Sequence, residues 1–98
     1  MTLRIQMRRP AQAEFNAAHK WYEQKRAGLG EEFSEEVHRV FDRILVTPKL
    51  YSCVYKDVRR APVHRFPYAV FYQILPDRIR IIAVFHDRRD PSSWQARV

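Results

Sequence analysis

The chain has 98 residues and a formal net charge of +7; hydrophobic residues make up 46% of it and aromatic residues 13%. This length predicts a single domain over residues 1–98, and the apolar content suffices for a packed core, which excludes general disorder. No stretch approaches the roughly 20 apolar residues of a membrane span, and we expect no signal peptide in the charged start LRIQMRRP. A single cysteine, Cys53, excludes an internal disulfide and fits a reducing compartment. We therefore expect a cytoplasmic protein without membrane contact.

The charge is unevenly distributed along the chain. Residues 1–30 carry six basic and two acidic groups, residues 31–58 four and six, and residues 59–98 eight and three. A basic C-terminal part suits an anionic partner, such as nucleic acid or an acidic protein. It equally suits a surface that only keeps the protein soluble, because charge alone does not define a partner.

The first 47 residues indicate a strand followed by two helices. Leu3, Ile5 and Met7 alternate with polar residues, which predicts a half-buried strand. Apolar residues then recur at helical spacing on both sides of Gly28 and Gly30. We expect Gly28 to take a left-handed cap and Gly30 to start the second helix. The segment of about 10–47 is thus predicted to be an antiparallel helical hairpin, ended by Pro48.

Within the first helix, Trp21 and Tyr22 are adjacent. Successive helical side chains point about 100° apart, so both cannot face the core fully. One of the two rings is therefore expected to lie at a loop or in a partner groove, and the sequence does not decide which.

The second half of the chain indicates strands. Residues 49–58 fit either an irregular strand or an ordered loop, whereas residues 59–66, 70–75 and 78–86 are predicted strands, with a tight turn at Pro76-Asp77. In the last strand we expect strict alternation, with Ile79, Ile81, Ala83 and Phe85 on one face and Ile82 and Val84 on the other. Apolar residues on both faces indicate a central strand that is covered on both sides.

These elements predict an α+β fold in the order β-α-α-β-β-β. The last three strands are joined closely enough to form an antiparallel meander. We expect the helical hairpin to cover one face of an antiparallel sheet and the tail, residues 91–98, to help cover the other face.

Arginines flank the predicted strands and form the main candidate site. Because their strands should be neighbours, we expect these cations to converge at one edge of the sheet, where they would hold a phosphate or a carboxylate. The same patch would also support ribonuclease chemistry by stabilising charge on a phosphate. The alternative is a solvated rim paired with Asp87 and Asp90. The residues concerned are Arg59, Arg60, Arg65, His86, Arg88 and Arg89.

Other polar groups predict no chemistry. The spacing of His64, His86 and Cys53 matches no zinc signature, so we expect neither a metal nor a cofactor. Cys53 has no recognisable base for nucleophilic catalysis and suits a small, half-buried position. The glutamates of residues 31–36 lie at a helix start opposite an apolar stripe, which is typical of a solvated face.

The assembled pattern resembles the RelE/ParE superfamily of toxins from type II toxin–antitoxin systems, over nearly the whole chain. The resemblance implies a small α+β toxin that is neutralised by a cognate antitoxin within a hetero-oligomer. The residues that carry it are Trp21-Tyr22-Glu23, Gly28-Leu29-Gly30, Phe33, Pro48, Phe66-Pro67-Tyr68, Val70 to Ile74, Ile82 to His86, Arg88-Arg89-Asp90-Pro91 and Trp94.

The superfamily has two branches. The RelE-like branch cuts messenger RNA on the ribosome, typically with an arginine after the aromatic residue that opens the third strand and with a tyrosine near the C-terminus. Here Ala69 follows Tyr68 and Trp94 occupies the place of that tyrosine, which removes two members of such a site. The FPY and HDRRDP-W segments look more like the ParE branch, which inhibits DNA gyrase and leaves it stalled on cleaved DNA.

The resemblance therefore implies first a gyrase-inhibiting toxin that arrests growth and has no chemistry of its own. The expected target- or nucleic-acid-binding residues are Arg59, Arg60, Arg65, His86, Arg88, Arg89 and Trp94. The expected antitoxin-binding residues are Phe15, Trp21, Tyr22, Phe33 and Val37. One alternative is a messenger-RNA endoribonuclease that uses Arg60, Arg65, His86 and Arg88. Another is a family member that binds its antitoxin without being toxic.

Overall fold

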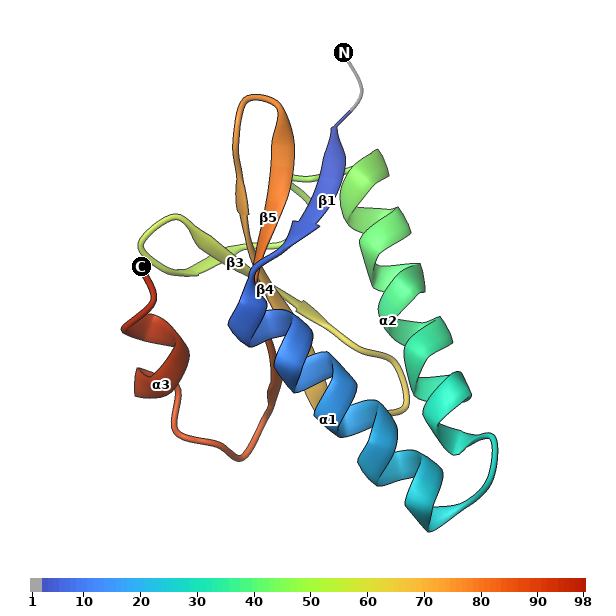
Figure 1. The fold of residues 1–98 in the computed structure, drawn as a ribbon. Coiled ribbons are helices and arrows are strands. Elements are labelled where there is room, and N and C mark those ends of the chain that lie inside the picture. The colour runs from blue at the N-terminus through green and yellow to red at the C-terminus, as the bar shows by residue number, and fades with distance from the viewer. Residues whose placement is uncertain (1–2) are drawn as a thin grey trace.

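The computed structural model describes residues 3–98, which form a five-stranded sheet with two long helices on one face and a short helix on the other (Figure 1). The order confirms the predicted α+β fold. The elements are β1 (Arg4–Met7), α1 (Arg9–Lys25), α2 (Leu29–Val46), β2 (Cys53–Tyr55), β3 (Val58–Pro62), β4 (Tyr68–Ile74), β5 (Arg78–His86) and α3 (Ser92–Gln95).

The strands lie in the order β1-β5-β4-β3-β2. From β2 to β5 each strand pairs antiparallel with the next along the chain, whereas β1 pairs parallel with β5, from Arg4 opposite Arg78 to Met7 opposite Ile81. The sheet is thus mixed, and the expectation of a purely antiparallel sheet was wrong. The helical hairpin carries the chain across the sheet before β2 begins, so β1 can join the far edge beside the last strand.

The meander differs from its prediction at two places. Residues 53–55 do form a short strand, which resolves the ambiguity of residues 49–58. The strand predicted over residues 59–66 ends at Pro62, because proline cannot donate a ladder hydrogen bond and Arg65 adopts a positive φ of 73°. Residues 63–67 therefore form the turn that leads into β4.

The helical hairpin closes through two glycines with different roles. Gly28 has φ of 89° and precedes the first residue of α2, as expected for a left-handed position. Gly30 lies within α2, so its prediction as the start of the helix was wrong; a Cβ there would lie 2.6 Å from the carbonyl oxygen of His19. The Glu23 carboxylate accepts hydrogen bonds from the amides of both glycines, each at 2.9 Å. No helix in residues 3–98 is long and apolar enough to cross a membrane.

The core has two parts, one on each face of the sheet. Between the sheet and the long helices, Phe33 is fully buried with Tyr22 and Phe66 packed around it, at centroid separations of 5.3 and 5.2 Å. On the other face, Trp94 of α3 stacks on Phe71 at 4.4 Å. The expectation that the tail covers the second face is confirmed.

A bulge in β5 overturns the expected alternation of that strand. Phe71 pairs with Ala83 but Tyr72 pairs with Ile81, so Ile82 is an extra residue. As a result Ile79, Ile81 and Val84 face the long helices, whereas Ile82, Ala83 and Phe85 face α3. The extra residue shifts every later side chain to the other face, and it brings His86 to the helical side beside Tyr68.

Candidate functional site

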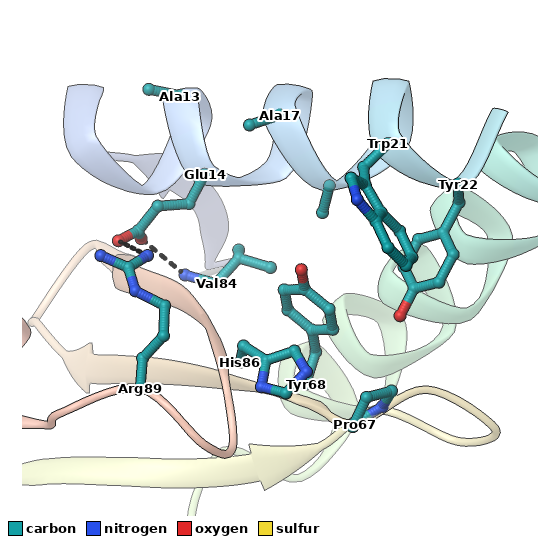
Figure 2. Close-up of a pocket in the computed structure, with 11 residues that line it drawn as sticks. Ala13, Glu14, Ala17, Trp21, Tyr22, Pro67, Tyr68, Val84, His86 and Arg89 are labelled. Carbon is teal, nitrogen blue, oxygen red and sulfur yellow. Dashed lines mark hydrogen bonds and ion pairs between the residues drawn. The ribbon is translucent and has the colours of Figure 1, made fainter. Parts of the chain in front are cut away.

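A groove of about 600 Å³ runs between α1 and the C-terminal part of β5 (Figure 2). Its walls are mostly apolar, and polar side chains gather towards one end. The lining residues are Ala13, Glu14, Ala17, Ala18, Trp21, Tyr22, Pro67, Tyr68, Val84, His86 and Arg89.

Aromatic rings form one end of the groove. Tyr22 is 9% exposed and packs in the core, whereas its neighbour Trp21 is 52% exposed and meets the Tyr22 ring edge-on at 5.0 Å. Tyr22 is therefore the buried ring of the pair and Trp21 the exposed one, which settles the choice that the sequence left open. Burial raises the pKa values of Tyr22 and Tyr68 above the usual value for tyrosine. Both hydroxyls thus stay neutral and can donate hydrogen bonds at neutral pH.

The polar end of the groove is built around Glu14. Arg97 binds both carboxylate oxygens of Glu14, at 3.1 and 2.7 Å, and the backbone amide of Val84 donates to Oε1 at 3.2 Å. Arg89 approaches Oε2 to 3.9 Å. Figure 2 shows Arg89 and the Val84 amide both directed at this carboxylate. The negative charge of Glu14 is therefore balanced by Arg97, and Arg89 keeps hydrogen-bond donors available for another anion.

His86 lies on the floor of the groove in a defined tautomer. The backbone amide of Arg88 donates to its Nδ1 at 3.0 Å, so the neutral ring carries its hydrogen on Nε2. The ring meets Tyr68 edge-on at 5.1 Å. Together with Arg89, the site offers donors for a carboxylate or phosphate rather than a free general base.

The groove also follows an open edge of β5. The parallel partner β1 reaches only to Met7, opposite Ile81. Beyond that point, side chains from distant parts of the chain bind the edge: Arg97 donates to the carbonyl of Ile82 at 2.9 Å, and Glu14 accepts from Val84. These side chains take the place of a strand neighbour.

The predicted convergence of arginines holds for part of the set. A smaller pocket of about 160 Å³ brings together Arg60, His86 and Arg89. Arg60 pairs with Asp87 at 3.0 Å, and the guanidinium of Arg89 lies over the Phe85 ring at 4.4 Å. The side chain of Arg88 is exposed nearby.

Arg59 and Arg65 do not join this patch, so their predicted convergence was wrong. Arg59 neighbours Arg60 in β3 and points to the opposite face, where it donates to the carbonyl of Tyr51 at 2.6 Å. Arg65 lies in the turn after β3 and pairs with Glu32 at the start of α2, at 2.9 Å.

Three of the expected contact residues are in the core instead. Trp94 is 2% exposed, and Phe33 and Val37 are fully buried, so all three side chains pack within the protein. Phe15 is half-buried and stacks on Phe33 between the two helices, away from the groove. Of the expected antitoxin-binding residues, only Trp21 and Tyr22 line the groove.

Sequence reasoning missed Glu14, Tyr68 and Arg97 as parts of this site. Tyr68 belongs to the quoted FPY segment, which was the available signal for it. Glu14 and Arg97 are 83 residues apart, and no local pattern marks them as partners. Residues 3–98 contain no group of three or more His, Cys, Asp or Glu side chains arranged to hold a metal ion.

Two comparisons with known proteins, one of structure and one of sequence, identify the family of this chain. A solved structure described as a chromosomal ParDE toxin–antitoxin system from P. aeruginosa has the same fold, with a TM-score of 0.75 and 12% sequence identity over 87% of this chain and 96% of that one. The sequence model for the ParE toxin of the type II toxin–antitoxin system parDE matches residues 5–91. The chain therefore belongs to the ParE toxin family, which confirms the superfamily resemblance. No curated protein matches the chain.

Proposed function

We propose that this protein is a toxin that inhibits DNA gyrase and is held inactive by a cognate antitoxin. The match to the ParE toxin family over residues 5–91 carries this proposal, because the branch of the superfamily that it names acts on gyrase. A gyrase inhibitor of this kind acts in the cytoplasm, where its target works.

The arrangement of the basic residues supports inhibition without hydrolysis. A messenger-RNA endoribonuclease would use Arg60, Arg65, His86 and Arg88 together. Arg65 is instead tied to Glu32, and Arg60 is paired with Asp87. A phosphate in the pocket beside His86 would meet Arg60 and Arg89. It would lack two groups of the nuclease branch, because Ala69 stands in the place of the arginine and Trp94 in the place of the tyrosine. We therefore assign Arg60, Arg88 and Arg89 to contacts with gyrase or its DNA.

The groove beside α1 supports the antitoxin part of the proposal. Its aromatic end suits apolar side chains, and Arg89 and His86 suit an acidic group. A chain with a net charge of +7 attracts a negatively charged partner. We propose that an acidic, amphipathic segment of the antitoxin orders in this groove, with an apolar residue on Trp21 and a carboxylate on Arg89.

A supercoiling assay tests the target. Purified protein added to gyrase and relaxed plasmid should block supercoiling and accumulate cleaved DNA. The Arg88→Gln/Arg89→Gln variant should inhibit more weakly, because both cations are exposed near the smaller pocket. Lys20→Gln, an exposed site on α1, serves as the control. Unimpaired supercoiling at a large excess of toxin would reject gyrase as the target.

Binding to the antitoxin encoded beside this gene tests the groove. Trp21→Ala should weaken binding about 30-fold, the equivalent of about 2 kcal/mol for an aromatic anchor. The matched control is Leu50→Ala, an exposed apolar residue outside the groove that is 57% exposed. Equal losses in the two variants, measured by calorimetry, would remove the groove from the proposal. Cell growth on induction without the antitoxin would separate a toxin from a member that only binds.

A further inference from the structure

The second face of the sheet is only partly covered. Helix α3 lies beside one part of it, whereas β1 and the first half of β5 extend beyond α3 (Figure 1). Ile5, Met7, Ile79 and Ile81 of these two strands pack towards the long helices. Because side chains alternate along a strand, the residues between them face the other way.

Those outward positions form an arginine face. The register sets Arg4 opposite Arg78 and Gln6 opposite Arg80, so the four side chains lie in two adjacent rows. Arg8 extends the first row on the same side, since it donates to the carbonyl of Arg97 beyond α3 at 3.2 Å. We call Arg4, Arg8, Arg78 and Arg80 the β1–β5 arginine face.

Few acids neutralise this face. Arg78 binds Asp77 at 2.7 Å and Gln6 at 2.7 Å. Asp57 accepts a hydrogen bond from Gln73, the residue opposite Arg80 in β4, at 2.9 Å. Within residues 3–98, neither Arg4 nor Arg80 has a carboxylate within ion-pair distance.

The register places like charges on neighbouring strands. Such strands lie about 4.8 Å apart, and like charges opposite each other disfavour pairing, while Asp77 offsets the charge only at Arg78. A bound polyanion would remove that repulsion. Arginine forks suit phosphate oxygens, and residues two apart in a strand are separated by about 6.8 Å, a spacing that lets one row reach successive backbone groups.

We propose that the β1–β5 arginine face binds the phosphate backbone of duplex DNA. Its outward strand positions carry arginine and glutamine, without the aromatic rings on which single-stranded nucleic acids stack. The choice of DNA as the duplex rests on the proposed gyrase target, where the toxin meets DNA. The face shares no residue with the groove proposed for the antitoxin or with the pocket beside Arg60 and Arg89, so it is a DNA contact additional to the one proposed for Arg60, Arg88 and Arg89.

The test measures binding of the full-length protein to a fluorescent random-sequence DNA duplex in the absence of gyrase, over a series of salt concentrations. The Arg4→Gln/Arg80→Gln variant should bind at least about tenfold more weakly at low salt, and the slope of log K against log salt should fall by about 2. The control, Lys20→Gln/Lys49→Gln, removes two charges from exposed sites outside the face. It should change affinity less than about threefold, because long-range charge is screened.

Thermal melting separates a binding role from a folding role. The Arg4→Gln/Arg80→Gln variant should bind DNA more weakly but melt no lower than the unmodified protein, because the change removes the repulsion between Arg4 and Arg78. Three results would overturn the proposal: equal weakening in both double variants, tighter binding to an RNA duplex, or equal binding to polyglutamate, which would indicate an acidic protein partner.

The outcomes for this surface and for the proposed function are distinguishable. Gyrase inhibition without duplex binding would reject the DNA surface and leave the toxin assignment intact. Duplex binding that depends on Arg4 and Arg80, without gyrase inhibition, would retain the surface and reject the gyrase target.

Discussion

The two tryptophans of this chain occupy opposite environments. Trp94 is 2% exposed and lies between α3 and the sheet, stacked on Phe71, whereas Trp21 is 52% exposed beside the groove. Family resemblance suggested that Trp94 meets the target. Its burial shows that it instead attaches the tail to the sheet, so the effect of its replacement would report unfolding.

We expect Trp94→Ala to lower the free energy of unfolding by about 3–5 kcal/mol, because it leaves a large cavity over Phe71. Trp21→Ala should cost about 1 kcal/mol or less, since it removes a mostly exposed ring. Urea unfolding followed by far-ultraviolet circular dichroism measures both. Similar costs for the two variants would contradict the assignment of Trp94 to the core.

Tyr72 gives the fold a sensitivity to alkaline pH. Its ring is fully buried in β4 and its hydroxyl donates to the carbonyl of Pro48 at 2.7 Å. Burial raises the pKa of Tyr72 to about 12, whereas an unfolded tyrosine titrates near pH 10. Between about pH 10 and 12 the unfolded chain loses this proton while the folded chain keeps it, so stability should fall with rising pH over that range.

The measurement is urea unfolding at a series of alkaline pH values, for the unmodified protein and for Tyr72→Phe. The variant should be less stable at pH 8, because it loses the hydrogen bond to Pro48, but it should lose less stability above pH 10. Parallel curves for the two proteins would show that Tyr72 does not cause the alkaline loss.

At the scale of elements, the helical hairpin depends on close approach at Gly30. The Glu23 carboxylate binds the amides of Gly28 and Gly30, and these hydrogen bonds lower the pKa of Glu23. A Cβ at Gly30 would meet the His19 carbonyl at 2.6 Å and the Glu23 carboxylate at 2.9 Å. The hydrogen bonds of Glu23 and the close approach at Gly30 therefore hold the start of α2 against the end of α1.

Gly30→Ala should destabilise the protein by about 1–3 kcal/mol, because the added methyl group forces the two helices apart. Gly28→Ala is the matched comparison: its φ of 89° strains an alanine by about 1 kcal/mol, yet no atom lies within 4 Å of the added Cβ. Thermal melting of both variants checks the order. A larger loss for Gly28→Ala would mean that backbone conformation, rather than helix contact, limits the hairpin.

For the whole molecule, the two ends of the chain are joined by Glu14 and Arg97. Their side chains are 11% and 17% exposed, and Arg97 also binds the open edge of β5 through Ile82. This contact fixes the tail after α3 and forms the polar end of the groove at once. Occupancy of the groove and attachment of the tail therefore share one ion pair.

A double-mutant cycle with Glu14→Gln and Arg97→Gln should give a coupling energy of about 1–3 kcal/mol, since the two groups bind through two hydrogen bonds in a partly buried setting. Chemical denaturation of the four proteins provides it. The coupling should persist at high salt, unlike that of an exposed pair. A value near zero would show that this ion pair does not contribute to holding the tail.

The sequence by itself determined the elements and their order except for β2, which it left open, and α3, which it did not predict. The alternation of Leu3, Ile5 and Met7, the helical stripes around Gly28 and the apolar runs after Arg59 are local patterns, and each sets a strand or helix through its own periodicity. The family could be inferred for the same reason, because its motifs are short and follow one another along the chain. Trp21 and Tyr22 were correctly expected not to share the core, since Tyr22 is buried and Trp21 is exposed.

Only the tertiary structure decided how these elements meet. The parallel pairing of β1 with β5, the bulge at Ile82 and the contact between Glu14 and Arg97 join residues far apart in the chain, and no local periodicity encodes such pairings. The candidate site depends on all three: the bulge sets the face of His86, the short pairing of β1 leaves the edge of β5 open, and the contact between Glu14 and Arg97 forms the polar end of the groove. The predicted places of Arg59 and Arg65 were wrong for two reasons. Arg59 points to the opposite face of β3 from Arg60, and Arg65 lies in the turn after β3, so nearness in sequence does not bring either side chain to the patch.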